Sequence, residues 1–190
     1  SGRQLGVVFG DYDGDGDTDL YVANDMTANF LFRNQGDGHF EEVGLVSGVA
    51  LSESARPGAG MGTDFGDTDR DGDLDLVVCN FQWESCRLYR NDGSGIFSDV
   101  TSASGLVGPT LRTLTFGTNF LDYDNDADLD LYLANGHVHP LVQEIDGATS
   151  YAQHDQLFRN NADGTFTEFT GPGLKTARVG RGSATADYDN

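Results

Sequence analysis

The stretch FGDYDGDGDTDLYVAN, residues 9–24, decides the architecture of this chain because it returns twice with the same internal spacing. Residues 65–80 read FGDTDRDGDLDLVVCN, and residues 120–135 read FLDYDNDADLDLYLAN. Each copy places five aspartates at alternate positions, where like charges repel one another unless a cation neutralises them. The pattern predicts three cation-binding loops carried by a repeated structural unit.

The spacing also indicates which cation binds. Alternate side chains converge on one point only in a tight loop, and Gly16 and Gly72 at the sixth position permit such a turn. This number of hard oxygen ligands favours calcium over magnesium or zinc. Carboxylates are expected from loop positions one, three, five and nine, and a backbone carbonyl from position seven. About three calcium ions per chain would then be held by Asp11, Asp13, Asp15, Asp17 and Asp19, by Asp67, Asp69, Asp71, Asp73 and Asp75, and by Asp122, Asp124, Asp126, Asp128 and Asp130.

The loops differ from an EF-hand, which has a glutamate at position twelve where this chain has Val22, Val78 and Leu133. The residues that follow each loop are β-branched and aromatic, so the loops are expected to join strands. In the third loop Ala127 replaces the glycine, and backbone strain there is expected to weaken the site. Asp187 and Asp189 begin a fourth block.

The repetition extends beyond the aspartates. The strings LFRNQGDGHFEEV (31–43), LYRNDGSGIFSDV (88–100) and LFRNNADGTFTEF (157–169) each have the form of a β-hairpin with a glycine-bearing turn. Four short antiparallel strands per unit, with block starts 56, 55 and 65 residues apart, predict an all-β fold of β-propeller blades without helices. The predicted divisions are 1–46 for a first blade with calcium loop 11–19, 60–107 for a second with loop 67–75, 114–175 for a third with loop 122–130 and insertion 136–155, and 181–190 for the first strand of an incomplete fourth blade.

The charge balance excludes several functions. The formal net charge is −20, and 11 scattered Lys and Arg residues argue against binding to nucleic acid. No apolar run reaches the length of a membrane span, so membrane insertion is not expected. No signal peptide precedes Ser1, and any export signal is expected to have been removed or to lie outside this chain. Calcium loops favour an extracellular or secreted location, which includes the bacterial periplasm and cell surface.

Cys79 and Cys86, the two cysteines of the chain, flank a short connection between two predicted strands. A cross-strand disulfide would agree with an extracellular setting, whereas two buried free thiols are the alternative. The sequence leaves both open.

The acidic blocks FGDYDGDGDTDL (9–20) and FGDTDRDGDLDL (65–76) resemble the FG-GAP or VCBS repeat of integrin α-chain-like propellers, whose signature pairs Phe-Gly with DxDxDGxxDL. Further strings, including LANGHVHP (133–140) and GRGSATADYDN (180–190), resemble the subgroup of cartilage acidic protein and the bacterial ASPIC/UnbV proteins. The resemblance implies calcium at loop positions one, three, five and nine, and extracellular adhesion, matrix or glycan contact more often than catalysis. Leu121 departs from the signature, because it replaces the glycine of Phe-Gly.

Two functions remain open at this stage. The first is a calcium-stabilised module that contacts an extracellular protein or glycan, with a homo-oligomer completing the propeller ring. The second is a calcium-dependent enzyme, a polysaccharide lyase or a phosphoester hydrolase, in which the metal acts as a Lewis acid. The second would use His137, His139 or His154 of the insertion to move protons, although their spacing matches no strong metal motif.

Overall fold

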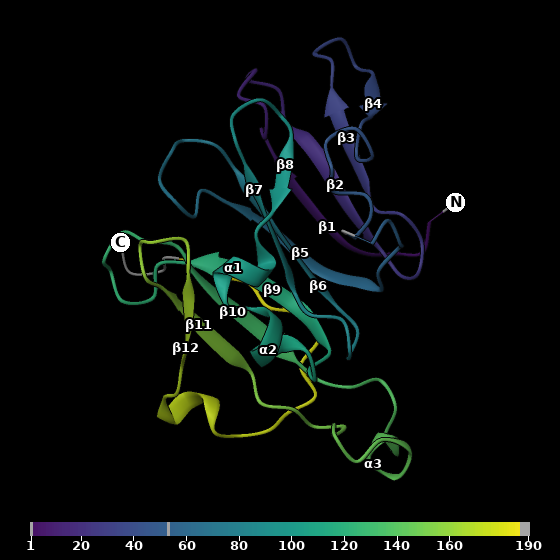
Figure 1. The fold of residues 1–190 in the computed structure, drawn as a ribbon, viewed down its shortest axis with the longest axis vertical. Helices are drawn as coiled ribbons and strands as arrows, with labels where there is room; N and C mark the ends of the chain where they lie inside the picture. The colour runs from purple at the N-terminus through teal and green to yellow at the C-terminus, as the bar shows by residue number, and fades with distance from the viewer. Residues whose placement is uncertain (1, 53, 187–190) are drawn as a thin grey trace.

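The computed structural model describes residues 2–52 and 54–186. Over these residues the chain forms three four-stranded antiparallel sheets, each with its strands in sequence order. The sheets stand side by side as three blades of a propeller, and blade 2 lies between the other two (Figure 1). The all-β propeller predicted from the repeat is therefore confirmed.

The strand bounds follow the repeat. Blade 1 comprises β1 (Gln4–Gly10), β2 (Asp19–Asn24), β3 (Phe30–Asn34) and β4 (Phe40–Glu42). Blade 2 comprises β5 (Gly60–Gly66), β6 (Asp75–Asn80), β7 (Arg87–Asn91) and β8 (Phe97–Asp99). Blade 3 comprises β9 (Thr115–Leu121), β10 (Asp130–Asn135), β11 (Gln156–Asn160) and β12 (Phe166–Phe169).

Short helices lie between the strands and after the last one, and the expectation of no helix was wrong. They are α1 (Thr101–Ser104), α2 (Val107–Thr110), α3 (Val142–Ile145) and the 3-10 turn η1 (Pro172–Leu174). Each is a single turn of three or four residues, which is too short to produce a visible helical period in the sequence.

The hydrophobic core lies between the blades. One cluster joins blades 1 and 2 through residues such as Tyr21, Leu31 and Leu76. A second joins blades 2 and 3 through residues such as Val77, Leu131 and Phe158. Because each blade buries its faces against its neighbours, the blade interfaces supply most of the apolar burial that stabilises the fold.

The recurring glycines of the inner strands are explained by close backbone approach. A Cβ at Gly6 would lie 2.1 Å from the carbonyl oxygen of Met61, and a Cβ at Gly62 would lie 2.4 Å from that of Phe116. The first strands of neighbouring blades thus pack so closely that a side chain at this position would collide with the next backbone.

The face of blade 1 that points away from blade 2 is apolar and open among the described residues. Leu5, Val7 and Phe9 alternate along β1 and are all exposed, with Phe9 at 65%. At the same repeat position Phe120 of blade 3 is 7% exposed, because it packs into the cluster shared with blade 2.

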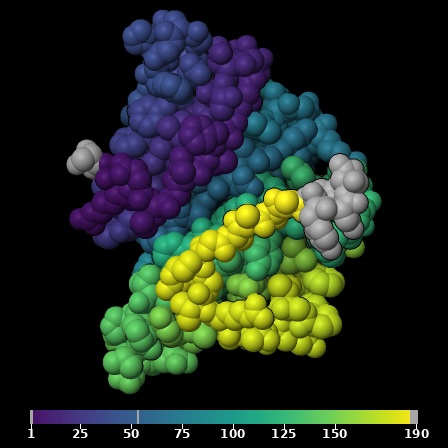
Figure 2. Space-filling view, turned by 180° about the vertical axis from the view of Figure 1, so that it is seen from behind, coloured from purple at the N-terminus to yellow at the C-terminus, as the bar shows by residue number. Residues whose placement is uncertain are grey.

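The segment after blade 3 crosses back over that blade (yellow over green in Figure 2). Ser183 donates a hydrogen bond to the side chain of Asn119 in β9. Residues 181–186, expected to start a fourth blade, form no strand, because no second strand of that unit lies in the described residues to pair with them. Asp187 and Asp189, which begin the fourth acidic block, lie outside the described residues.

Cys79, in β6, and Cys86, just before β7, are joined by a disulfide. Of the two alternatives left by the sequence, the bridge is therefore present, and the described residues contain no free cysteine. None of the helices within residues 2–52 and 54–186 combines the length and apolar character that a membrane crossing requires.

Candidate metal centres in the acidic loops

The three acidic stretches occupy the same place in each blade, between its first and second strands. The sixth loop residue has a left-handed backbone in all three, with φ of 93° at Gly16, 99° at Gly72 and 69° at Ala127. Its amide donates to the first aspartate of its own loop, over 3.0 Å from Gly16 to Asp11 and 3.1 Å from Gly72 to Asp67. The first carboxylate of each loop therefore fixes the turn.

These turns bring carboxylates together. The structure groups Asp11 with Asp13 and Asp15, Asp67 with Asp69 and Asp71, and Asp122 with Asp124 and Asp130. In each group, one oxygen per residue lies within 4.8 Å of the others. Loop positions one and three meet in every blade, while position five completes the first two groups and position nine the third.

The aspartates at the ninth loop position accept hydrogen bonds from backbone amides of their own blade. Asp19 is fully buried, and its two carboxylate oxygens accept from the amides of Asn34, over 2.8 Å, and Tyr12, over 3.1 Å. Asp75 and Asp130 accept amide hydrogen bonds from the same two repeat positions. Each of these carboxylates thus ties its loop to the third strand of its blade.

The remaining predicted residues lie at the edges of the groups. The backbone amides of Asp17 and Asp73 donate to the fifth-position carboxylates of their own loops. Their side chains lie beside the hairpin glycines Gly36 and Gly93. Asp126 accepts from the amide of Asp128 over 2.9 Å, and the Asp128 carboxylate forms an ion pair elsewhere.

Burial and the crowding of like charges raise the pKa values of aspartates within the loops. Burial raises the pKa of Asp13, and the charge of Asp15 adds to that rise. Burial likewise raises the pKa of Asp69, with the charge of Asp71 contributing. For Asp75 burial raises the pKa to about 6, even though hydrogen bonds from Thr68 and Asn91 oppose the shift. Ionised carboxylates are therefore disfavoured here without a compensating positive charge.

A second observation tests whether a cation fits these groups. The Oδ1 atom of Asp11 is buried and has no hydrogen-bond partner in the described residues. An ionised oxygen removed from water needs a partner, and it lies in the same side chain that groups with Asp13 and Asp15. The donor set, all carboxylate oxygen, is the one that calcium prefers.

Neighbouring blades are also bonded to each other at these loops. The side-chain amide of Asn91 donates to the carbonyl of Tyr12 in the loop of blade 1 over 2.7 Å. Asn160 does the same to the carbonyl of Thr68 in the loop of blade 2 over 2.8 Å. Arg70 of the second loop reaches the carboxylate of Asp128 in the third over 2.6 Å. Sequence reasoning missed these links, although the recurrence of asparagine after each Leu-Tyr/Phe-Arg was a visible signal.

Ala127 gives a direct test of backbone strain. A residue with a Cβ in the left-handed conformation lowers the free energy of unfolding by roughly 1–2 kcal/mol through strain. Glycine removes this strain, but its greater freedom in the unfolded chain offsets part of the gain. We expect Ala127→Gly to raise the melting temperature by about 2–3 °C in calcium. The reciprocal change Gly16→Ala should lower it, because an added Cβ there meets no atom within 4 Å and so introduces strain alone. Equal melting of all three proteins would show that this strain is absent.

The histidines of the insertion lie in two different settings. His137 is buried, its Nδ1 accepts from the amide of His139, and burial lowers its pKa. His154 instead lies near the carbonyl of Leu174, with its Nδ1 at 3.2 Å. Among the described residues, the groups with metal-binding geometry consist of aspartates.

Comparisons with known proteins agree with the repeat. The family model described as an FG-GAP-like repeat matches residues 11–78 and 67–133, which together cover more than half of the chain. Cartilage acidic protein 1 of Homo sapiens is 25% identical over 189 residues, covering 89% of this chain and 27% of that relative. The Xenopus tropicalis protein of the same name is 27% identical, covering 97% of this chain and 27% of its own length. This chain thus spans about a quarter of the length of these relatives.

A solved structure, of an Agrocybe aegerita lectin described as recognising non-reducing terminal N-acetylglucosamine, is 18% identical, with a TM-score of 0.49 over 88% of this chain and 38% of the lectin. The family match rests on the loops themselves, since its two segments begin at Asp11 and Asp67, the first aspartates of the first two loops. The chain therefore belongs to the FG-GAP-like repeat family.

Proposed function

We propose that this chain is a calcium-binding extracellular β-propeller module that contacts a protein or glycan partner, as in adhesion. The observation that carries the calcium assignment is the buried, unpartnered Oδ1 of Asp11 within a group of three carboxylates. Two further groups of the same composition repeat in blades 2 and 3, so we assign about three ions per chain.

In each loop the aspartates at positions one, three, five and nine would hold the ion, and the residue at position seven would offer its backbone carbonyl. When bound, calcium neutralises the carboxylates and fixes the turn between the first two strands of a blade. The chain itself contributes the hydrogen bonds that join each loop to the third strand of its blade and to the next blade, through residues such as Asp19, Asn91 and Asn160. The module is thus stabilised by its ions.

An extracellular location supports this proposal on two physical grounds. The Cys79 to Cys86 disulfide persists in oxidising compartments. Calcium is abundant outside cells, where modules with dissociation constants of about 0.1–1 mM are filled.

The test is a calorimetric calcium titration of chelated protein. We expect binding of about three ions per chain, and loss of about one ion in Asp69→Asn, because that carboxylate is central to the second group. Asp37→Asn is the matched control, since Asp37 is an exposed aspartate in a hairpin turn outside the loops. Absence of heat at millimolar calcium would overturn the assignment.

We also propose that a second copy of the chain covers the open face of blade 1. Phe120, which occupies the repeat position of Phe9, is covered by the preceding blade, so the exposed row of Leu5, Val7 and Phe9 matches a blade interface. Light scattering should give twice the monomer mass at tens of micromolar protein, and Phe9→Asp should return it to the monomer. Phe40→Asp, at an exposed phenylalanine of β4, is the control. A wild-type monomer would contradict the proposal.

A further inference from the structure

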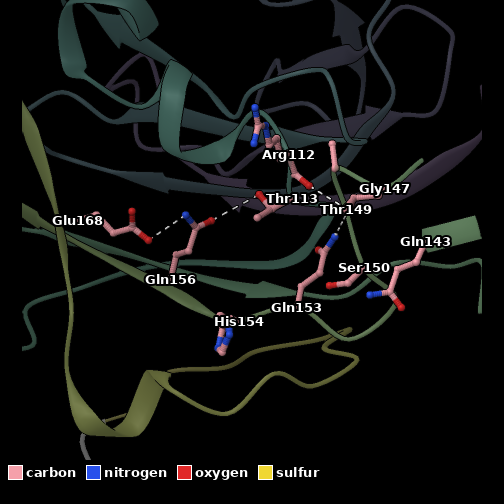
Figure 3. Close-up of a pocket in the computed structure, with 11 residues that line it drawn as sticks. Arg112, Thr113, Gln143, Gly147, Thr149, Ser150, Gln153, His154, Gln156 and Glu168 are labelled. Atoms are coloured by element: carbon pink, nitrogen blue, oxygen red, sulfur yellow. Dashed lines mark hydrogen bonds between the residues drawn. The ribbon is translucent and has the colours of Figure 1, made fainter.

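Blade 3 carries a polar cleft of about 400 Å³ that the acidic loops do not touch. Its walls come from the segment after α2, from the end of the insertion and from β11 and β12 (Figure 3). The acidic loop precedes β10, whereas the insertion follows it, so the cleft lies at the other end of that strand. It is therefore separate from the candidate metal centres.

The cleft is formed in part by a connection in blade 3 that is much longer than its counterparts in blades 1 and 2. The connection between the second and third strands spans residues 25–29 in blade 1 and 81–86 in blade 2, but 136–155 in blade 3. Loops that exceed their counterparts in a repeated scaffold are where binding sites concentrate, because the shared residues already account for the fold.

A layer of buried amides fixes the base of the cleft. Gln153 accepts from the amide of Leu114 over 2.9 Å and donates to the hydroxyl of Thr149 over 2.9 Å. Gln156 donates to the carbonyl of Pro109 over 3.1 Å and to the carboxylate of Glu168 over 3.0 Å. Both glutamines are more than nine-tenths buried, so the base is pre-organised.

Some hydrogen-bonding capacity of the lining residues is not used within the described residues. Gln153 uses one of its two amide hydrogens and Glu168 one of its two carboxylate oxygens in the bonds above. The amide of Gln143, on α3, has no partner among the described residues, and its side chain projects at the cleft margin in Figure 3. The cleft thus offers unused donors and an acceptor among its lining residues.

A second cleft of about 340 Å³ adjoins the first, sharing His154 and Glu168 with it. Phe169 and Leu174 give it a mainly apolar lining. A ligand that spans both spaces would place a hydroxyl-rich edge on the amides and an apolar face against the phenylalanine ring.

We propose that the two clefts together bind a sugar residue of a neutral glycan, which specifies the partner class of the proposed function and rests on it. Separate hydroxyl groups of a glycan can donate to Glu168 and accept from Gln143, which lie at opposite sides of the cleft in Figure 3, and a sugar ring also presents an apolar C–H face. A phosphate group does not fit, because Glu168 would repel it and the guanidinium of Arg112 points away from the glutamines in Figure 3. The lining by polar side chains favours the hydroxyl groups of a sugar over an extended peptide, which is bound mainly through its backbone.

The test uses the calcium-loaded protein and a panel of neutral oligosaccharides built from glucose, mannose or N-acetylglucosamine. Binding is followed by calorimetry and by the side-chain amide signals of Gln153 and Gln156 in nuclear magnetic resonance spectra. We expect Gln143→Ala and Glu168→Gln each to weaken binding about tenfold, the scale for losing one well-placed hydrogen bond. Glu144→Ala is the matched control for the first, because Glu144 neighbours Gln143 on α3 but does not line the cleft. Glu41→Gln, at an exposed glutamate of β4, is the control for the second.

Binding that shifts the Gln153 and Gln156 signals and is weakened by the two cleft variants alone would support the proposal. Three outcomes would overturn it: no oligosaccharide binds, a sugar binds while those signals stay unchanged, or a peptide library occupies the cleft in its place. The same samples are melted with and without chelator. If chelator lowers the melting temperature but no sugar binds, the cleft proposal is wrong and the calcium assignment stands. If chelator leaves the melting temperature unchanged, the calcium assignment is wrong.

Discussion

We expect chelation of calcium to lower the melting temperature of this protein by about 10 °C. With calcium near 1 mM and a dissociation constant near 0.1 mM, each occupied loop adds roughly 1.4 kcal/mol to the free energy of unfolding. Three loops add about 4 kcal/mol, a large part of the total stability of an ordinary domain. A domain of this size loses about 2–4 °C for each kcal/mol. Differential scanning calorimetry in millimolar calcium and in excess chelator measures the shift.

Two controls separate site binding from general charge screening. Magnesium at the same concentration should restore little of the shift, because it requires a small octahedral shell and gives up its waters reluctantly. Raising the sodium chloride concentration should restore only the part that arises from repulsion between exposed carboxylates. A melting temperature that is the same with calcium and with chelator would end the argument that these loops hold structural ions.

The second large effect is expected from Asn91→Ala, which should lower the free energy of unfolding by about 2–3 kcal/mol. The side chain is fully buried and donates to the carbonyl of Tyr12, one blade away, and to that of Leu74 in its own blade. Alanine leaves both carbonyls without this donor, and the carbonyl of Tyr12 belongs to a different blade. Asn160→Ala should behave alike, since Asn160 bonds the carbonyls of Thr68 and Leu129.

The repeat supplies the control for this experiment. Asn34 occupies the same position in blade 1 and bonds the carbonyl of Thr18 in its own loop, but no earlier blade lies in the described residues for it to reach. Asn34→Ala should therefore cost less than about 1 kcal/mol. Chemical denaturation of the three variants compares the effects, and an equal loss in all three would show that the contact across blades contributes nothing.

Much of the fold could be predicted from the sequence because its signals are local and repeated. The aspartate blocks fix the turn between the first two strands, and the glycine turns such as Gly36 and Gly38 fix the third and fourth as a hairpin. The strain at the sixth position of the third loop was also predictable, since Ala127 has φ of 69° where a glycine is usual. These features depend on residues within a few positions of one another.

Contacts across blades could not be predicted in the same way. The ion pair of Arg70 with Asp128 joins residues of different repeats, and nothing in either block alone indicates it. The cleft depends on the path that the insertion takes back to β11, held by contacts such as Trp83 with Asp146 over 2.8 Å. The sequence indicated the histidines of that insertion as candidates for proton transfer, whereas in the structure the cleft is lined by the glutamines Gln143, Gln153 and Gln156.

The hydrogen bonds that asparagines make between blades also run in one direction along the chain. Asn91 and Asn160 both reach backwards, from a later blade to the loop of an earlier one. During synthesis an emerging blade can dock at once on a loop that is already made, while the newest loop waits for the blade that follows. We therefore expect such a chain to assemble from its N-terminal blade onward, with the most recently made loop the least protected.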